Sequence, residues 1–218
     1  MENPHGRLII KKLTLTDLAD GAPIPVRFAF GRHDPQTHVR FSDNLNPGVR
    51  WRDLPAGTRS LVLICVDETA PSVADDVNRE GRSVPADLPR APFYHWAIVD
   101  LDPASGGIDE GACARGVTPH GKRAPSGPAG ARQGLNDYTS WFAADPDMAG
   151  DYYGYDGPCP PWNDSIPHRY HFTLYATDLA RCAVDGPFTG PAVLKAIEGH
   201  VLALDRITGT YAVNPQAR

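Results

Sequence analysis

The sequence predicts a mainly β fold in a single domain over residues 1–218, and three observations support this. Glycine and proline supply 21 and 22 of the 218 residues, an abundance typical of chains with many turns and long irregular connections rather than helical bundles. Residues 60–66 form an almost unbroken apolar run of strand length. Residues 168–177 alternate between an apolar and a polar face, as a half-buried strand does. A chain of this length can bury a proper core.

The N-terminal part predicts two strands before the apolar run. Residues 8–15 read as the first, and residues 26–30 read as a second, short one after a turn signal at Asp20-Gly21. Residues 31–50 are polar, and we expect them to be irregular. The run at 60–66 predicts a strand that is buried on both faces.

Asp67 follows that run and shares the parity of Leu61, Leu63 and Cys65, so its carboxylate continues a buried face. A buried carboxylate is costly unless it is paired or hydrogen-bonded, which makes Asp67 a candidate site residue. The simpler alternative is that Asp67 caps the following turn, a common role for aspartate before a loop with proline.

Residues 93–101 predict the next strand, with His95 on the face of Ala97, Val99 and Leu101. If this strand is the antiparallel neighbour of 60–67, Asp67 and His95 meet, provided that the register allows it. The flanking segments 72–92 and 103–151 show no period and predict long loops, which are usually functional. We expect aromatic residues to tether the second loop and line a pocket; they are Tyr138, Trp141, Phe142, Tyr152, Tyr153 and Tyr155.

The stretch 157–178 joins a rigid loop to a strand. Its four prolines exclude a helix or a central strand in its first half. His168 then opens the apolar face of Tyr170, Phe172, Leu174 and Ala176. A titratable ring between a stiff loop and a buried face is typical of a small polar pocket, although a histidine hydrogen-bonded to backbone at the edge of the core is equally compatible.

The C-terminal part predicts a helix and a last strand. After a turn-rich connection at 179–188, Thr189-Gly-Pro191 starts a helix, with proline at an early position where it is tolerated. Val193, Ile197, Val201 and Leu204 keep helical spacing on one face. Residues 207–213 predict the final strand.

Composition limits the partners and the compartment. A net charge of −5 argues against general nucleic-acid affinity. The polar N-terminus and its short apolar run predict neither a signal peptide nor a membrane helix, so we expect a cytoplasmic protein. The four cysteines lack zinc spacing and are expected to be reduced, with Cys65 packed in the core and Cys159 exposed beside the pocket.

Three blocks of sequence resemble the phosphatidylethanolamine-binding protein family, particularly its bacterial members related to the Raf kinase inhibitor protein. The segment Leu54 to Pro71 is similar to the strand leading into the family's Asp-Pro-Asp-x-Pro motif. Tyr94-His95-Trp96 is similar to its Trp-His-Trp strand, and Gly157-Pro-Cys-Pro-Pro161 with His168-Arg169-Tyr170 is similar to its Gly-x-x-Pro-Pro and Gly-x-His-Arg motifs. Their order and spacing match, and a weaker likeness extends from about residue 8 to 213.

This resemblance implies a large antiparallel sheet packed on a smaller one, with peripheral helices. It also implies a small anion-binding pocket that takes phosphate-bearing head groups. The implied lining is Asp67, His95, His168 and Tyr170, with Pro71 and Pro161 shaping the loops. In the family, the prolines of these motifs often follow cis bonds.

The chain departs from the family pattern at the expected rim of the pocket. Glu68 and Thr69 stand where the family usually has proline and aspartate, so one carboxylate is missing. Ile166-Pro167 replaces the usual glycine before His168, and the loops at 72–92 and 103–151 look longer than in compact bacterial members. Ligand identity is therefore carried over less safely than the fold.

Three functions fit these residues, and we favour the first. As a binding module for a small anionic or phosphorylated ligand, His95 and His168 donate hydrogen bonds to the anion while Asp67 orients a histidine. As an enzyme, Asp67 with His95 or His168 acts as an acid–base pair in a hydrolytic, dehydrating or cyclising step on a small metabolite. As a metal site, the two histidines and Asp67 form a minimal ligand set. We expect no cofactor and leave a homodimer open.

Overall fold

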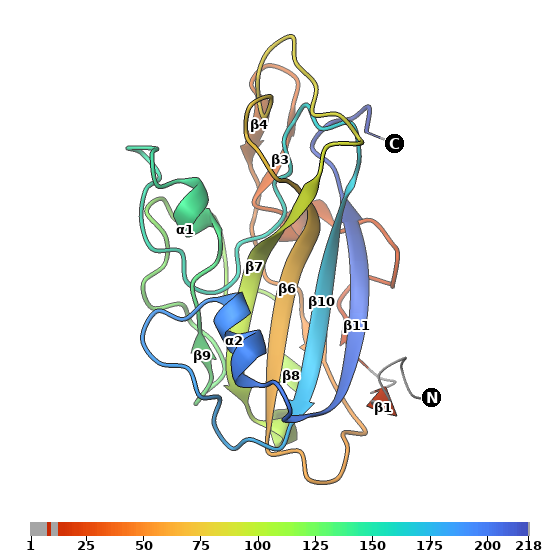
Figure 1. Ribbon diagram of the computed structural model, residues 1–218, viewed down its shortest axis with the longest axis vertical. Coiled ribbons are helices and arrows are strands. Elements are labelled where there is room, and N and C mark those ends of the chain that lie inside the picture. The colour runs from red at the N-terminus through yellow and green to blue at the C-terminus, as the bar shows by residue number, and fades with distance from the viewer. Residues whose placement is uncertain (1–7, 10–12, 218) are drawn as a thin grey trace.

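The computed structural model describes residues 8–9 and 13–217, and its ribbon is drawn in Figure 1. Strands form most of the regular structure, and the two α-helices are short. In chain order the elements are β1 (Leu8–Ile9), β2 (Thr14–Leu15), η1 (Val26–Phe28, a 3-10 helix), β3 (Gly31–Asp34), β4 (His38–Phe41), β5 (Val49–Arg50), β6 (Ser60–Pro71), β7 (Arg90–Leu101), η2 (Pro103–Ser105), β8 (Gly107–Ile108), β9 (Arg132–Gln133), α1 (Tyr138–Trp141), β10 (His168–Thr177), α2 (Gly190–Ala196) and β11 (Val201–Tyr211).

A large sheet of six strands dominates the molecule, in the order β1-β11-β10-β6-β7-β9. All neighbours in it are antiparallel except β1 and β11, which are parallel. A smaller sheet has the order β2-β5-β8, and β3 and β4 form a separate hairpin at one end of the molecule (Figure 1). This architecture confirms the predicted fold class: a large antiparallel sheet, a smaller sheet and peripheral helices.

The two faces of the large sheet bury different cores. One face packs on the small sheet, because Leu15, Val49 and Ile108 of that sheet share a hydrophobic cluster with Leu63 and Phe172. The other face is covered by α2 and the chain before it (Figure 1). That second cluster contains Val62, Ile64, Val66, Ala97, Val99, Cys182, Val184, Phe188, Val193 and Ile197.

The central strands follow their sequence pattern. In β6 the odd residues Leu61 and Leu63 lie in the first core and the even residues Val62 and Ile64 in the second, which confirms burial on both faces. In β10 the residues from Tyr170 to Ala176 on the even face lie in the first core, as predicted from the alternation. These strands carry the site residues at one end.

Two predictions for the N-terminal part were wrong. The expected strand 8–15 is two short strands in different sheets, because Leu8 pairs with Ala203 whereas Thr14 pairs with Arg50; residues 10–12 between them lie outside the described residues. Residues 26–30 are not a strand. Their backbone curls into the single 3-10 turn η1, with the N–H of Phe28 donating to the carbonyl of Pro25 (2.9 Å).

The polar segment 31–50 is more regular than expected. It holds the hairpin β3–β4 and the short strand β5. The hairpin turn is closed by the Asp34 carboxylate, which accepts hydrogen bonds from the backbone N–H groups of Gln36 (2.9 Å) and Thr37 (3.0 Å). The polar residues between 31 and 41 therefore reflect a hairpin at the molecular surface rather than irregular backbone.

The predicted C-terminal helix is too long and the predicted last strand too short. Helix α2 ends at Ala196, and Gly199 has a left-handed φ of 82°, a conformation that favours glycine and ends the helix. The chain then enters β11 at Val201 and pairs with β10 along its whole length. The helical spacing of Val201 and Leu204 was a coincidence, since both belong to the strand.

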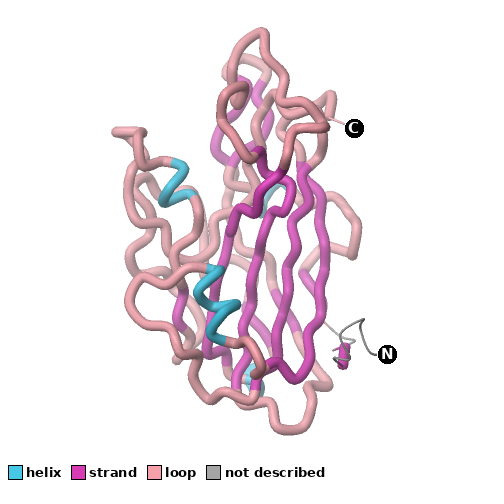
Figure 2. The backbone as a smooth tube through the Cα atoms, in the orientation of Figure 1, coloured by secondary structure: helices cyan, strands magenta, loops and turns pink. Residues whose placement is uncertain are grey.

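Long connections fill much of the rest of the molecule, as Figure 2 shows. Because β6 runs to Pro71 and β7 begins at Arg90, the first loop is 72–89, slightly shorter than predicted. The second loop contains only η2, β8, β9 and α1. The implied cis prolines are not found, since residues 8–9 and 13–217 contain no cis peptide bond. Over the same ranges no helix has the length and apolar character needed to cross a bilayer.

Candidate functional site

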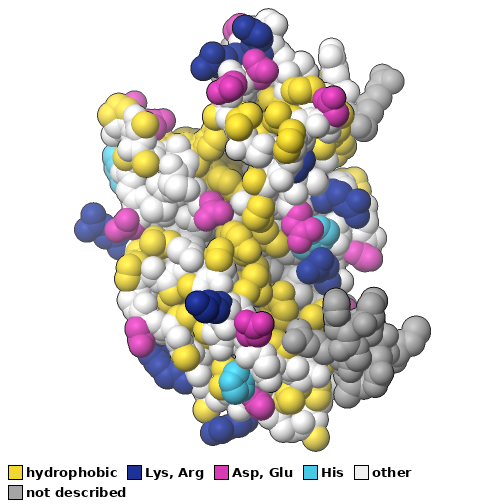
Figure 3. Space-filling view, viewed as in Figure 1, with side chains coloured by type: hydrophobic (Ala, Val, Ile, Leu, Met, Phe, Trp, Pro, Cys, Tyr) yellow, Lys and Arg dark blue, Asp and Glu magenta, His cyan; other side chains and the backbone are white. Residues whose placement is uncertain are grey.

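A cavity of about 640 Å³ lies at one end of the large sheet, between the ends of its central strands and the surrounding loops. Figure 3 shows hydrophobic side chains gathered in a hollow between the α1 segment and the upper loops. Every residue that the sequence predicted for the site lines this cavity: Asp67, Pro71, His95, Pro161, His168 and Tyr170. Whether they bind a ligand stays a prediction.

Strand pairing brings Asp67 and Tyr170 together at one end of the sheet. Strand β6 lies between β10 and β7. Tyr170 is the register partner of Asp67 on one side, and Phe93 is its partner on the other. The end of β6 therefore lies beside the starts of both neighbours. The antiparallel pairing with β7 was predicted, but the register sets Asp67 opposite Phe93 rather than His95.

His95 reaches the cavity only because β7 is irregular. By simple alternation it would share the face of Ala97 and Val99, as predicted, but those two residues lie in the core under α2. The register shifts between the pairs Cys65–Trp96 and Val66–Tyr94, which leaves His95 as the extra residue of a β-bulge. A bulge redirects side chains, and His95 consequently points to the cavity, beside Tyr170 and Tyr138. The prediction that His95 lies on the same face as Ala97 and Val99 was therefore wrong.

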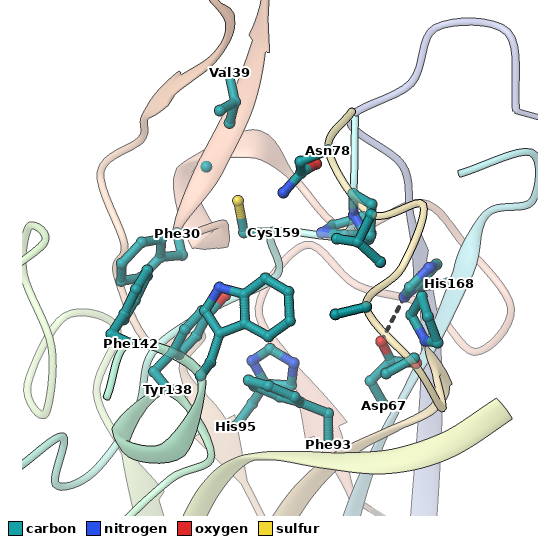
Figure 4. Close-up of a pocket in the computed structure, with 18 of the residues that line it drawn as sticks. Phe30, Val39, Asp67, Asn78, Phe93, His95, Tyr138, Phe142, Cys159 and His168 are labelled. Atoms are coloured by element: carbon teal, nitrogen blue, oxygen red, sulfur yellow. Dashed lines mark hydrogen bonds and ion pairs between the residues drawn. The ribbon is translucent and has the colours of Figure 1, made fainter. Parts of the chain in front are cut away.

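Asp67 and His168 form a buried pair, drawn as a dashed line in Figure 4. The His168 Nδ1 and Asp67 Oδ2 atoms are 2.6 Å apart, and the two side chains are 1% and 3% exposed. The other Asp67 oxygen accepts from the N–H (2.7 Å) and hydroxyl (2.6 Å) of Thr69. Both interpretations of Asp67 therefore hold: it orients a histidine, and it caps the turn that follows.

Thr69 is one of the positions that depart from the family pattern, and it has a clear structural role. Its hydroxyl donates to Asp67 and also accepts a hydrogen bond from the backbone N–H of Arg169 (2.9 Å). It thereby links the end of β6 to the start of β10, on either side of the Asp67–His168 pair.

Asp164 is a site residue that the sequence analysis missed. Its Oδ2 lies 2.9 Å from Nε2 of His168, so the ring has a carboxylate on each side. The Arg90 guanidinium donates to both oxygens of Asp164, over 2.6 and 3.1 Å. The available signal was the position of an aspartate four residues before His168 in an otherwise rigid loop.

Pairing of opposite charges shifts the pKa values of His168, Asp67 and Asp164 in the direction that favours their charged forms. Burial lowers the pKa of His168, but the hydrogen bonds to Asp164 and Asp67 outweigh it, and the pKa is raised overall. Burial raises the pKa of Asp67 and of Asp164, but the hydrogen bond and charge of His168, together with Thr69 for Asp67 and Arg90 for Asp164, outweigh it, so both pKa values are lowered. The carboxylates are therefore ionised and His168 favours its charged form.

His95 lies in a different environment at the floor of the cavity (Figure 4). Its Nδ1 lies 2.8 Å from the backbone oxygen of Asp156, so Nδ1 carries the hydrogen and donates. Burial lowers the pKa of His95, and the nearby Asp67 charge offsets this only in part. Among the described residues Nε2 has no hydrogen-bond partner, which leaves it for a ligand.

Aromatic side chains form most of the remaining walls. Phe30, Tyr138 and Phe142 stack on one another on one side of the cavity, and Phe93 lies next to His95 (Figure 4). Three of the predicted aromatic residues thus line the cavity: Tyr138, Trp141 and Phe142. Trp141 and Phe41 are 45% and 54% exposed at the mouth. The cavity therefore combines a polar inner end with an apolar body.

The cysteines are free thiols, as predicted, and Cys65 is buried in the core. Cys159 is half-buried and lines the cavity, where burial raises its pKa to about 12. A thiol with so high a pKa is a poor nucleophile at neutral pH. Over residues 8–9 and 13–217, no three His, Cys, Asp or Glu side chains are arranged to hold a metal ion.

Comparison with known proteins agrees with this fold. A family model described as phosphatidylethanolamine-binding protein matches residues 14–212. A UPF0098 protein of Methanothermobacter thermautotrophicus is 32% identical over 177 residues, which cover 81% of this chain and 89% of the relative. The UPF0098 protein YbhB of Escherichia coli is 28% identical over 201 residues, covering 92% and 99%.

Two solved structures share the fold. A putative phosphatidylethanolamine-binding protein homologue from Chlamydia trachomatis superimposes with a TM-score of 0.60 at 26% identity, covering 91% of this chain and 95% of the other. YbcL of Escherichia coli, described as a member of the mammalian PEBP family, has a TM-score of 0.65 at 23% identity, covering 93% and 98%. The fold and site define a two-sheet β protein with a cavity at the end of its large sheet. The chain belongs to the phosphatidylethanolamine-binding protein family, and this membership supports a ligand-binding protein.

Proposed function

We propose that this protein binds a small ligand with an anionic or phosphorylated group in the cavity at the end of the large sheet. The observation that carries the proposal is the cavity itself, whose inner end brings His95, His168 and Tyr170 together. Its volume, about 640 Å³, lies in the range typical of small-molecule sites. The family's name adds a phosphate-bearing lipid head group as one source of such an anion.

Hydrogen-bond donors at the inner end support an anionic partner. His95 Nε2 becomes a donor when its ring takes up a second proton, while the Tyr170 hydroxyl is a donor at any ordinary pH. Neither atom has a protein partner among the described residues. His168 was expected to donate as well, but both of its ring nitrogens face carboxylates. His95 and Tyr170, rather than His168, are therefore the residues that donate hydrogen bonds directly to the anion.

The acid–base alternative uses the same residues and is less well supported. A general acid or base must bring a nitrogen within hydrogen-bond reach of the reacting atom. Both nitrogens of His168 are already engaged. The free ring nitrogen belongs to His95, whose other nitrogen faces a backbone oxygen rather than Asp67, so the expected pair of Asp67 with a histidine leaves no nitrogen for a substrate. Binding without turnover therefore remains the favoured function. A cytoplasmic location and a homodimer stay predictions from the sequence.

Calorimetric titration tests the proposal. Inorganic phosphate and phosphoethanolamine are titrated into the wild type, the His95→Ala variant and the Tyr170→Phe variant. The titrations are run at acidic pH, where the His95 ring takes up its second proton and Nε2 donates. Loss of a hydrogen bond to a charged ligand is worth roughly 1.5–3 kcal/mol, so under these conditions His95→Ala should weaken binding by about 10- to 150-fold. His200→Ala is the matched control, because His200 is exposed and pairs with Asp178.

The control variant should bind as the wild type does. Absence of saturable binding by the wild type, or affinity indifferent to both His95→Ala and Tyr170→Phe, would require the proposed function to be given up.

A further inference from the structure

The His168 ring is enclosed on both sides by carboxylates from different parts of the chain. Asp67, in the second half of β6, meets Nδ1 at 2.6 Å, and Asp164, in the proline-rich loop, meets Nε2 at 2.9 Å. The His168 and Asp164 side chains are each 1% exposed. Water therefore does not separate these groups.

This geometry determines how many protons the ring carries. An ionised carboxylate has no hydrogen to donate, so each ring nitrogen that bonds to one must itself carry a hydrogen. Asp164 is kept ionised by two hydrogen bonds from Arg90, and Asp67 by two from Thr69. With a hydrogen on each nitrogen, His168 is an imidazolium cation.

We propose that Asp164 is a positioning residue of the cavity: with Asp67 it holds His168 as an imidazolium, whose constant positive charge offsets the Asp67 carboxylate at the ligand site instead of donating a hydrogen bond to the anion. This inference rests on the proposed function for its role in ligand binding. The double hydrogen bond itself does not depend on any ligand.

The elements packed around His168 place several charged or titratable groups near its ring. Strand β6 contributes Asp67, the loop contributes Asp164, and β7 contributes Arg90 and His95, while Tyr170 lies beyond the ring on β10. Arg90 and His168 together balance the two carboxylates. Removing the charge of Asp164 leaves two cations with one carboxylate, so the imidazolium loses its second partner and gains a repulsive neighbour in Arg90.

The arrangement predicts how ligand binding depends on pH. The raised pKa of His168 keeps its charge through neutral pH, so phosphate affinity should not fall near 6.5, where an ordinary histidine loses its proton. The His95 donor is lost at lower pH, because the pKa of that ring is lowered. Above that range, affinity should fall again only as the pH rises through the higher pKa of His168. In Asp164→Asn this fall should move to lower pH.

The direct test is a ¹⁵N NMR titration of the histidine side chains between pH 5 and 9. In the wild type, both His168 nitrogens should give protonated signals at pH 7. Loss of an opposite charge at hydrogen-bond distance should lower the pKa of His168 by about one unit or more in Asp164→Asn. Asp100→Asn is the matched control, because Asp100 is a buried carboxylate that pairs with Arg132 (2.7 Å) away from the cavity.

Calorimetry then measures the phosphate affinity of the wild type, Asp164→Asn and Asp100→Asn. At one pH unit above the variant's His168 pKa, only about a tenth of the molecules carry the charge, so affinity should be about tenfold weaker than in the wild type. Asp100→Asn should change neither result.

A neutral His168 in the wild type at pH 7 would overturn the inference, and this measurement needs no variant to fold. A His168 pKa that is the same in Asp164→Asn and the wild type would overturn it too. If phosphate does not bind the wild type while the NMR titration behaves as expected, the proposed function fails and the double hydrogen bond stands.

Discussion

The histidines at the inner end of the cavity differ in charge although their rings lie close together. His168 has a carboxylate on each ring nitrogen and favours the charged form. His95 has a backbone oxygen on Nδ1, is 3% exposed and has a lowered pKa, so at neutral pH it is uncharged. Local partners, not residue type, therefore decide what each ring offers to a ligand.

A pH-dependent loss of stability is expected from His95. Its pKa is lower in the folded protein than the value near 6.5 of the unfolded chain, so below about pH 6.5 the unfolded state takes up the proton first. The wild type should then lose stability relative to His95→Asn, by at most about 1.4 kcal/mol per pH unit. Above pH 6.5 the difference between the two proteins should be constant.

Urea unfolding at pH 7.5, 6.5 and 5.5 measures this difference. The exposed His200, replaced by asparagine in the same way, serves as the control. A wild-type-to-variant difference that does not change between pH 7.5 and 5.5 would contradict the expectation for His95.

At the scale of the elements, short irregularities in regular strands and helices place the site. A bulge in β7 turns His95 away from the α2 side of the sheet and into the cavity. The left-handed Gly199 ends the α2 segment and allows β11 to begin two residues later. In the first case one extra residue redirects a side chain, and in the second one glycine redirects the backbone.

Gly199 offers a test of this helix ending. A Cβ at this position would meet nothing within 4 Å, so a substitution is opposed only by the left-handed backbone. Gly199→Ala should therefore lower the free energy of unfolding by about 1–2 kcal/mol. Gly199→Asn should lose less, because asparagine tolerates this conformation better than alanine does. Equal losses for both variants in urea denaturation would show that backbone conformation is not the cause.

At the scale of the whole molecule, one buried carboxylate joins loops that are distant in sequence. Asp156 is 0% exposed and accepts hydrogen bonds from Asn44 (2.7 Å), Asn136 (2.9 Å) and Lys122 (2.7 Å). Its backbone oxygen meets the ring of His95. The second long loop and the segment around Asn44 are therefore anchored at a single point directly behind the cavity floor.

Asp156→Asn should be strongly destabilising. The variant leaves the Lys122 ammonium, which is 13% exposed, without its carboxylate and sets a donor against the amide donors around it. Breaking such a buried pair typically costs about 3–5 kcal/mol. The exposed Asp178, replaced by asparagine, is the control and should cost roughly 0.5 kcal/mol or less. Comparable losses for the two variants in denaturant unfolding would refute this role of Asp156.

Local patterns in the sequence were enough to predict the central strands and to choose Asp67, His95 and His168 as candidate site residues. The apolar run of β6 and the alternation of β10 report burial directly, because side chains in a strand point to opposite faces in turn. The three motif blocks led to the family and to Asp67, His95 and His168, which the fold does bring to one cavity.

Only the tertiary structure decided how those residues interact. The face of His95 depends on a bulge in the pairing of β7 with β6, and Asp164 becomes a partner of His168 only when the loop folds against the end of the sheet. The ends of α2 and β11 likewise depend on pairing with β10, which overrode a helical spacing. A local pattern records which side chains are buried, whereas register, bulges and charge partners arise from segments far apart in the chain. The sequence by itself therefore determined the central strands and the choice of Asp67, His95 and His168, but neither Asp164 nor the geometry that joins these residues.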